Sequence, residues 1–432
     1  MGGMLETLRN AWKIPDLRKK ILFTIAMLLV FRIGAHIPNP GLDPQKFSEL
    51  LESAGSLGGF LDIISGGSFK LATVFAMSIT PYINSSIIMQ LLTVAIPALE
   101  RLQKEGEEGR KIIQQYVRYG AVILGLVQAI ALYITMQAQG AVFDGGSVWS
   151  FLTIVLTFTA GTAFLMWLGE QITEYGIGNG ISLIIFAGIV SRAPSGVIGI
   201  IDNYKLGNFG QGIFGIIVII LILIMFVIVI AGVIWVQEAE RRIPIQYAKR
   251  VVGRKMYGGQ STHLPIKVNL AGVIPIIFAM SIMMFPSTII TMFFATSDNW
   301  FVNLFKNPEK SPLYIILYAL LILFFTFFYS VIQFNPIEIA NNMKKNGGFI
   351  PGYRPGKATS DYITKVLNRI TWFGGFFLAI ITVAPIILGN ITNIPGIWFG
   401  GTAVLILVGV ALDTVKQIES QMLMRHYKGF LE

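Results

Sequence analysis

Residues 213–236, IFGIIVIILILIMFVIVIAGVIWV, contain no charged or hydrogen-bonding side chain other than the indole of Trp235. The stretch is longer than the roughly 20 apolar residues that an α-helix needs to cross a bilayer. Hydrophobic residues make up 54% of the 432 residues and charged residues 13%, whereas soluble domains carry about 25% charged residues. Because so few charges cannot cover the surface of a soluble globule, we expect a membrane protein.

Similar apolar segments recur along the chain on both sides of this stretch. Each is close to the spanning length, and several contain Gly or Pro, which helices in lipid tolerate. The sequence therefore predicts an all-α polytopic membrane protein with ten transmembrane helices. The predicted spans are 21–37, 71–97, 117–137, 148–169, 181–201, 213–236, 271–295, 313–334, 371–391 and 398–413.

Lysine and arginine are unevenly shared between the two sets of loops that these spans define. Arg32 falls inside the first span, and the loops on one side hold only Lys46, Lys70, Arg192, Lys205, Lys306 and Lys310. The other basic residues lie in or beside the loops 1–20, 98–116, 170–180, 237–270, 335–370 and 414–432. The positive-inside rule puts this second set, and both termini, in the cytoplasm. We expect a multi-pass protein of the cell inner or plasma membrane.

One apolar segment is too short to span. Residues 57–69, LGGFLDIISGGSF, have apolar residues at helical spacing and are bracketed by Gly pairs. Thirteen helical residues rise only about 20 Å, less than the ~30 Å hydrocarbon core. The segment is interpreted either as a short helix that re-enters the membrane from the outer side or as a helix on the outer surface.

The residue types in the spans exclude several functions. Their central parts contain no Asp, Glu or Lys, which argues against a secondary transporter of small solutes, the alternative function, because such carriers usually keep an ionisable residue there. The chain has no Cys, and its three His residues lie in separate loops. We therefore expect no metal, no cofactor and no catalytic residue, so not an enzyme. Residues 352–359, GYRPGKAT, resemble a P-loop but have the wrong spacing.

Two loops of the basic set are longer than a connection requires. In 237–270, the alternation of Ile243, Ile245 and Tyr247 before a Gly-Gly pair predicts a β-hairpin that projects from the membrane. Both this loop and 335–370 carry a net positive charge. A few charges would satisfy the positive-inside rule, so loops of this size indicate a docking surface for RNA or an acidic protein.

Six strings of residues occur in a characteristic order: MSITPYINSSIIMQLLTV, QKEGEEGRK, FLMWLGEQITEYGIGNGISLIIFAGI, YAKR, QSTHLPIKVNLAGVIPIIFA and GYRPGKAT. They resemble the SecY family, the central subunit of the protein-conducting channel, nearly from end to end. The resemblance implies a passive channel that translocates unfolded secretory proteins and releases membrane proteins laterally into the bilayer. It also implies two pseudo-symmetric five-helix halves, residues 1–200 and 201–432.

The resemblance further implies a plug, a pore ring and a lateral gate between spans two and seven. The plug falls on residues 57–67, with the apolar side chains Phe60, Leu61, Ile63 and Ile64. The pore ring falls on Ile83, Ile87, Ile181, Ile185, Ile277 and Ile406. Such a ring of branched apolar side chains is a constriction that water leaves readily. In a chain so rich in isoleucine, the ordinary alternative is packing against lipid or a neighbouring helix.

A polar cluster lies beside the predicted ring, on the second span: Asn84, Ser85, Ser86 and Gln90. One interpretation is a gate seam that weak polar contacts hold and that an apolar signal sequence parts. The other is ordinary hydrogen bonding between helices, since such bonds contribute about 0.6 kcal/mol in membranes. The sequence does not decide between them.

The implied partners include the subunits SecE and SecG, signal sequences, translocating polypeptides and the lipid bilayer. Because the chain has no nucleotide site, its motor must be separate, and the resemblance implies the SecA ATPase or the ribosome. Arg354 and Lys357 in the second loop are the expected SecA contacts. The expected ribosome contacts in the first loop are Arg242, Lys249, Arg250 and Arg254.

Overall fold

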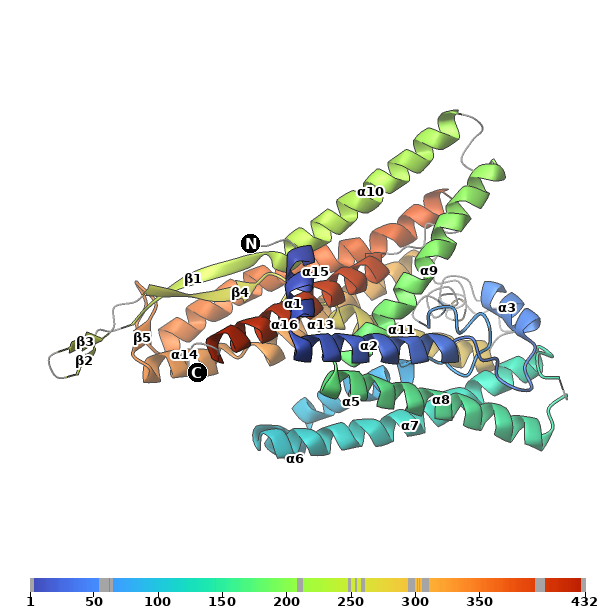
Figure 1. The fold of residues 1–432 in the computed structure, drawn as a ribbon, viewed down its shortest axis with the longest axis horizontal. Helices are drawn as coiled ribbons and strands as arrows, with labels where there is room; N and C mark the ends of the chain where they lie inside the picture. The colour runs from blue at the N-terminus through green and yellow to red at the C-terminus, as the bar shows by residue number, and fades with distance from the viewer. Residues whose placement is uncertain are drawn as a thin grey trace. The chain divides into compact units, whose positions relative to one another are not determined.

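The computed structural model describes residues 4–53, 62, 65–143, 145–207, 213–247, 250–252, 255–257, 261–293, 300, 302, 304, 311–392 and 401–428. Helices dominate these residues (Figure 1). The chain divides into two compact units. Unit 1 comprises Met1–Asn208, Met284–Ser311 and Ile406–Glu432, and unit 2 comprises Phe209–Met283 and Pro312–Leu405.

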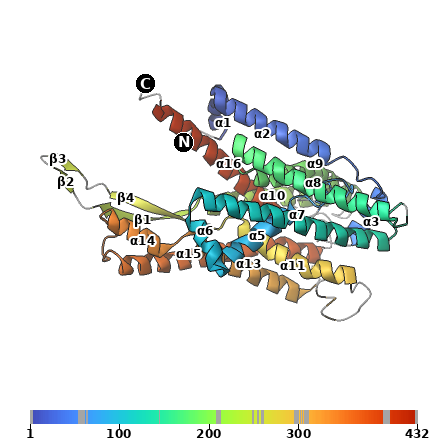
Figure 2. The same cartoon turned by 90° about the horizontal axis from the view of Figure 1, so that it is seen from below.

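Unit 1 is built from helices. Its elements are α1 (Met4–Lys13), α2 (Pro15–Gly34), α3 (Pro44–Ser53), α5 (Thr80–Ala95), α6 (Pro97–Lys104), α7 (Glu107–Ala138), α8 (Val148–Tyr175), α9 (Gly180–Lys205) and most of α16 (Gly401–Lys428). The long helices α7 and α8 lie side by side (Figures 1 and 2). Phe158 of α8 and Met136 of α7 are fully buried in their shared core.

A glycine turn fixes how α9 follows α8. Asn179 caps α9 by accepting the backbone N–H of Ser182 at 3.2 Å. A Cβ on Gly180 would lie 1.9 Å from the carbonyl oxygen of Gly169, so only glycine permits this approach of the two helices. The hydroxyl of Thr24 on α2 accepts the N–H of Ile177 at 3.0 Å and ties the turn to α2. The turn therefore holds the predicted ring helix α9 in place.

Unit 2 combines helices with a small sheet. Its elements are α10 (Ile213–Glu238), β1 (Glu240–Tyr247), β2 (Arg250–Val252), β3 (Lys255–Tyr257), β4 (Ser261–Lys267), the first half of α11 (Ile274–Phe293), α13 (Pro312–Gln333), α14 (Pro336–Lys345), β5 (Gly348–Phe349) and α15 (Lys357–Thr392). The antiparallel pairing of β1 with β4 and of β2 with β3 confirms the predicted hairpin. Pro244, in β1, lies opposite His263.

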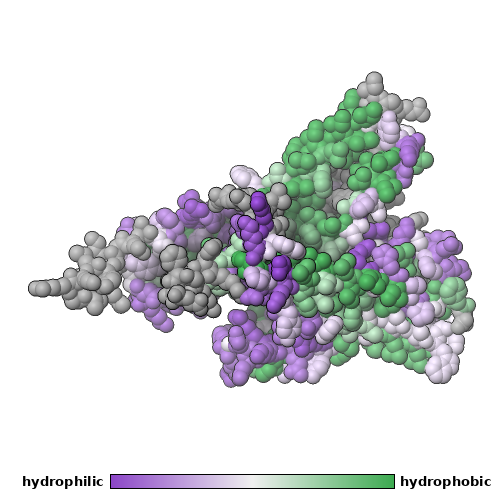
Figure 3. Space-filling model, viewed as in Figure 1, coloured by the Kyte–Doolittle hydropathy of each residue, from purple (hydrophilic) through white to green (hydrophobic). Residues whose placement is uncertain are grey.

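The predicted spans all overlap helices, but their number is not settled by length and hydropathy. Seven helices among the described residues are long and apolar enough to cross a membrane, or up to eight if α5 and α6 count as one span bent by 101°. The count of ten stays a prediction, as do the two halves 1–200 and 201–432. Figure 3 shows hydrophobic residues gathered on α10. Only 6% of the most apolar stretch of this helix is buried inside the protein.

The predicted start of the second span is wrong. Its helix, α5, begins at Thr80, and residues 65–79 form successive turns. Ala72 and Ser78 have positive φ angles of 48° and 53°, which a helix cannot accommodate. Ala72, Ala76 and Met77 are nevertheless buried in the core of unit 1. Their apolar character therefore reflects packing inside the protein and not a continuous spanning helix.

Candidate functional site

The described part of the short segment before α5 is buried in unit 1. Asp62 and Ser65 are only 3% and 1% exposed, which favours the re-entrant interpretation over a helix on the surface. The predicted plug residues Phe60, Leu61, Ile63 and Ile64 lie outside the described residues. The site can therefore be built from Asp62 and from residues 65–70.

Asp62 is the centre of a hydrogen-bonded turn. Its carboxylate accepts the backbone N–H of Lys70 at 2.8 Å, and its carbonyl accepts the N–H of Gly67 at 2.8 Å. The Ser65 hydroxyl donates to the same carbonyl at 3.2 Å and accepts the N–H of Phe69 at 3.0 Å. Gly66 and Gly67 have φ angles of 66° and 90°, values that favour glycine. This sequence therefore folds into one specific turn.

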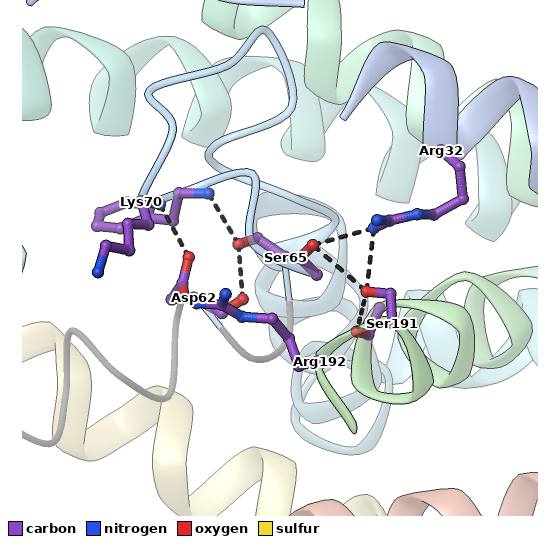
Figure 4. Close-up of polar contacts among 9 residues, drawn as sticks. Arg32, Asp62, Ser65, Lys70, Ser191 and Arg192 are labelled. Carbon is purple, nitrogen blue, oxygen red and sulfur yellow. Dashed lines mark hydrogen bonds and ion pairs between the residues drawn. The ribbon is translucent and has the colours of Figure 1, made fainter. Parts of the chain in front are cut away.

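Two arginines from different helices hold this turn (Figure 4). The guanidinium of Arg192 on α9 forms an ion pair with the Asp62 carboxylate, whose side chain is 4% exposed. Nη1 of Arg32 on α2 donates to the Gly66 carbonyl and to the Ser191 hydroxyl, both at 3.0 Å. Arg32, Ser191 and Arg192 together are called the arginine clamp below.

The clamp contains two positive charges, and the turn pairs one carboxylate with it. Arg32 contacts Ser191, the residue beside Arg192, and Asp62 is the carboxylate that pairs with Arg192. Removing one partner of a buried ion pair typically costs about 3–5 kcal/mol, because the other charge is left without compensation. The clamp can therefore hold the segment strongly while it is seated.

The predicted ring residues are distributed over four helices. Ile87, Ile185 and Ile406 are buried, and Ile83, Ile181 and Ile277 are half-buried. Ile277 belongs to unit 2 and the other five to unit 1. Closure of these six side chains around a pore therefore stays a prediction.

The predicted gate residues of α5 differ in their contacts. The buried Ser85 hydroxyl donates to the Val117 carbonyl of α7 at 2.8 Å, which is ordinary hydrogen bonding between helices. Gln90 donates to the Ser86 hydroxyl at 3.3 Å on the same helix. Oδ1 of Asn84 is buried and has no hydrogen-bond partner among the described residues. Their role in a gate stays a prediction.

The two long basic loops form one folded body in unit 2, a feature that the sequence did not reveal. β5, from 335–370, pairs with β1, from 237–270, through Gln246 with Phe349 and Tyr247 with Gly348. The resulting sheet has the order β4–β1–β5. Ile243, Ile266 and Ile363 are among the buried residues of its core. This body of sheet, α14 and the start of α15 is called the platform below.

Three of the predicted docking residues are exposed on the platform. Arg354 and Lys357 are exposed, and the Arg354 carbonyl accepts the Thr359 hydroxyl at 2.8 Å. Arg242 is 69% exposed and pairs with Glu240 at 2.6 Å. Arg250 lies in β2, whereas Lys249 and Arg254 lie outside the described residues.

The described residues include no group of three or more His, Asp or Glu side chains that could hold a metal ion. His36 contacts the carbonyl of Arg32 at 2.8 Å, and His263 lies on β4 of the other unit. The contacts described above are hydrogen bonds, ion pairs and apolar packing.

Comparison with known proteins decides the family. The SecY family model matches residues 73–415. The chain belongs to the SecY family. The protein translocase subunit SecY of Halalkalibacterium halodurans is 47% identical over 437 residues, covering 99% of this chain and all of that protein. SecY of Thermotoga maritima is 46% identical, covering 99% of this chain and 98% of that protein.

Solved structures agree with the SecY fold. A structure of a protein-conducting channel has a TM-score of 0.61 at 19% identity, covering 94% of this chain and 92% of its own. Sec61 in a canine ribosome–channel complex has a TM-score of 0.57 at 18% identity, with the same coverage. This SecY-family chain is a multi-pass membrane protein of a protein-conducting channel and is not an enzyme. No finding supports a small-solute transporter.

Proposed function

We propose that this chain is the passive pore through which unfolded secretory proteins cross the membrane and from which membrane proteins leave laterally. The segment around Asp62 is its plug. The observation that supports this role is the turn formed by Asp62 and residues 65–70; Asp62 and residues 65–68 are buried, and polar contacts hold the turn in unit 1. A segment held in this way can leave its place without unfolding a membrane helix.

The pore ring consists of Ile83, Ile87, Ile181, Ile185, Ile277 and Ile406. Branched apolar side chains present no fixed polar ligand to a passing polypeptide and impede ions when they close. Asn84, Ser86 and Gln90 contribute to a lateral gate along α5, because weak polar contacts part readily when an apolar signal sequence replaces them. Ser85 instead joins α5 to α7, as its bond to Val117 indicates.

The platform receives the motor. Its exposed residues Arg354 and Lys357 suit the carboxylates of the SecA ATPase, since arginine forms bidentate pairs with carboxylates. Arg242 and Arg250, together with Lys249 and Arg254, suit the phosphates of ribosomal RNA. The solved Sec61 complex with a ribosome supports this partner. SecE and SecG complete the assembly.

We further propose that the platform and both termini lie in the cytoplasm and that the chain lies in the cell inner or plasma membrane. The uneven distribution of Lys and Arg between the two sets of loops supports this orientation.

Crosslinking tests the pore directly. The chain has no cysteine, so a single Cys at position 83 or 277 provides a unique attachment point. A preprotein arrested during translocation should crosslink to either position. The matched control is Ile88→Cys on the same helix α5, where Ile88 is 44% exposed and lies roughly 140° around the helix from Ile83. Equal crosslinking at 83 and 88, or none at 83 and 277, would contradict the proposal.

A further inference from the structure

The arginine clamp contains more positive charge than the turn it holds. Arg192 pairs with Asp62, while Arg32 bonds to a neutral carbonyl and a neutral hydroxyl. An arginine fork matches the two oxygens of a carboxylate, and a guanidinium is satisfied best by such a partner. The clamp thus has the donor set of a carboxylate-binding site.

We propose that Arg32, Ser191 and Arg192 form a binding site for carboxylates of the translocating polypeptide, a site that Asp62 fills while the plug is seated. The inference rests on the proposed function, because it requires the plug to move and a polypeptide to pass. Asp62 is then an internal competitor of the acidic side chains of the substrate.

Removal of the plug leaves Arg192 without the Asp62 carboxylate and Arg32 without the Gly66 carbonyl, while the contact of Arg32 with Ser191 stays. Asp62 and Gly66 belong to the same turn, so the carboxylate and the carbonyl depart together. Ser191 and Arg192 stay together because both lie on α9, where Ser191 also donates to the Gly188 carbonyl at 2.7 Å. Arg192 has a side-chain exposure of 27%, so its guanidinium is partly withdrawn from water. A guanidinium that is partly withdrawn from water is stabilised when another hydrogen-bond acceptor replaces the one it has lost.

Aspartate or glutamate of the passing chain is the acceptor with the right chemistry. Its carboxylate reproduces the contact that Asp62 makes with Arg192, whereas asparagine offers a similar shape without the charge. Acidic residues should therefore dwell at the clamp and delay the return of the plug, and amides should pass without this delay.

Two matched preproteins test the site: one carries a run of six aspartates in its mature part, and the other six asparagines at the same positions. Purified wild-type complex with its motor, in vesicles without a membrane potential, should move the aspartate run roughly two- to fivefold more slowly, the range expected for partly exposed charge pairs. The readout is the ratio of the two rates at which the preproteins become protease-protected. A change in motor activity alters both rates equally and therefore leaves their ratio unchanged.

In the double variant Arg32→Gln/Arg192→Gln, the ratio of asparagine to aspartate transport rates should fall toward one. In Arg192→Lys, which keeps the positive charge, the ratio should lie between one and the wild-type value. Asp62→Asn, which keeps both arginines and removes the internal competitor, should raise the ratio above wild type. This opposite change does not depend on the arginine variants being well folded. A wild-type ratio of one, or a ratio unchanged in these variants, overturns the carboxylate site. Failure of wild-type complex to move the asparagine preprotein would instead count against the proposed channel.

Discussion

The guanidinium of Arg192 on α9 and the carboxylate of Asp62 form an ion pair that joins a spanning helix to a segment that does not span. Both groups lie largely away from water, and Arg32 contacts the same turn at Gly66. The position of the segment therefore depends on the opposite charges of Asp62 and Arg192. Substitutions at these residues should alter the closed channel before they alter the fold.

Reversing one charge of this pair should open the channel, and reversing both should close it again. Asp62→Arg places a third positive charge beside Arg32 and Arg192 and should destabilise the seated segment by about 3 kcal/mol or more. The double variant Asp62→Arg/Arg192→Asp restores an opposite-charge pair. Single-channel conductance in planar bilayers measures the open fraction. Equal leak in the single and double variants would show that the pair does not hold the segment.

Replacing Ile83 with Ser should make the closed channel leak. If the ring closes as proposed, the substitution removes up to ~1.5 kcal/mol of apolar contact from the closed state, so the open fraction should rise by up to about tenfold. Ion flux from vesicles and export of a preprotein with a weakened signal sequence should both increase. Ile88→Ser on the same helix, at a position 44% exposed, is the control. A leak as large in the control would remove Ile83 from the ring.

Arg354→Glu should abolish most SecA-driven export while the chain still inserts into the membrane. The variant replaces an exposed guanidinium with a charge that repels a partner carboxylate, and Arg354→Lys should retain partial activity because lysine cannot form the bidentate pair. Export rates into vesicles give the measurement. Lys46→Glu, at an exposed lysine predicted on the opposite side, should export normally. Export by Arg354→Glu at the wild-type rate would contradict the assignment of Arg354 as a SecA contact.

Ile243→Ala should loosen both platform loops together. Ile243 lies in β1 and is 1% exposed within a core that includes Ile363 of the second loop. Truncating a buried isoleucine costs about 2–5 kcal/mol. Limited proteolysis should therefore cut 335–370 faster, although the substitution lies in 237–270. The neighbouring Arg242→Ala, at an exposed position, provides the comparison and should not change the cleavage rate.

Gly180→Ala should reduce the amount of folded chain, and Gly199→Ala should not. A Cβ at Gly180 would meet the Gly169 carbonyl at 1.9 Å, whereas nothing lies within 4 Å of a Cβ at Gly199 on the same helix. Overpacking of this kind costs about 1–3 kcal/mol. Thermal aggregation of the purified complex distinguishes the two variants. Equal thermal stability of both would mean that α8 can shift to make room.

Hydropathy located the helices because a span must be apolar along most of its length. It misplaced the start of α5 because Ala72, Ala76 and Met77 are apolar through burial in turns, and no pattern in the sequence separates the two cases. The alternation of Ile243, Ile245 and Tyr247 was enough to predict β1. A strand of two residues such as β5 has no period to detect.

The arginine clamp was visible in the sequence only as separate charges. Arg32 lay within a predicted span, Arg192 at the end of another, and Asp62 in an apolar segment too short to span. Charges inside a membrane protein are usually paired, so a search for opposite charges could have suggested Asp62 with either arginine. The choice of Arg192 depends on the glycine turn at Gly66 and Gly67, which no spacing rule supplies.

The length of α15 joins the platform to an apolar segment within a single helix. The helix runs for 36 residues from Lys357 to Thr392, which at 1.5 Å per residue is roughly 54 Å, nearly twice the ~30 Å core of a bilayer. A stiff rod of this length acts as a lever. If a motor docks near Lys357, as proposed, the same helix carries its force toward the apolar end, through Gly374 and Gly375 and on to Pro385.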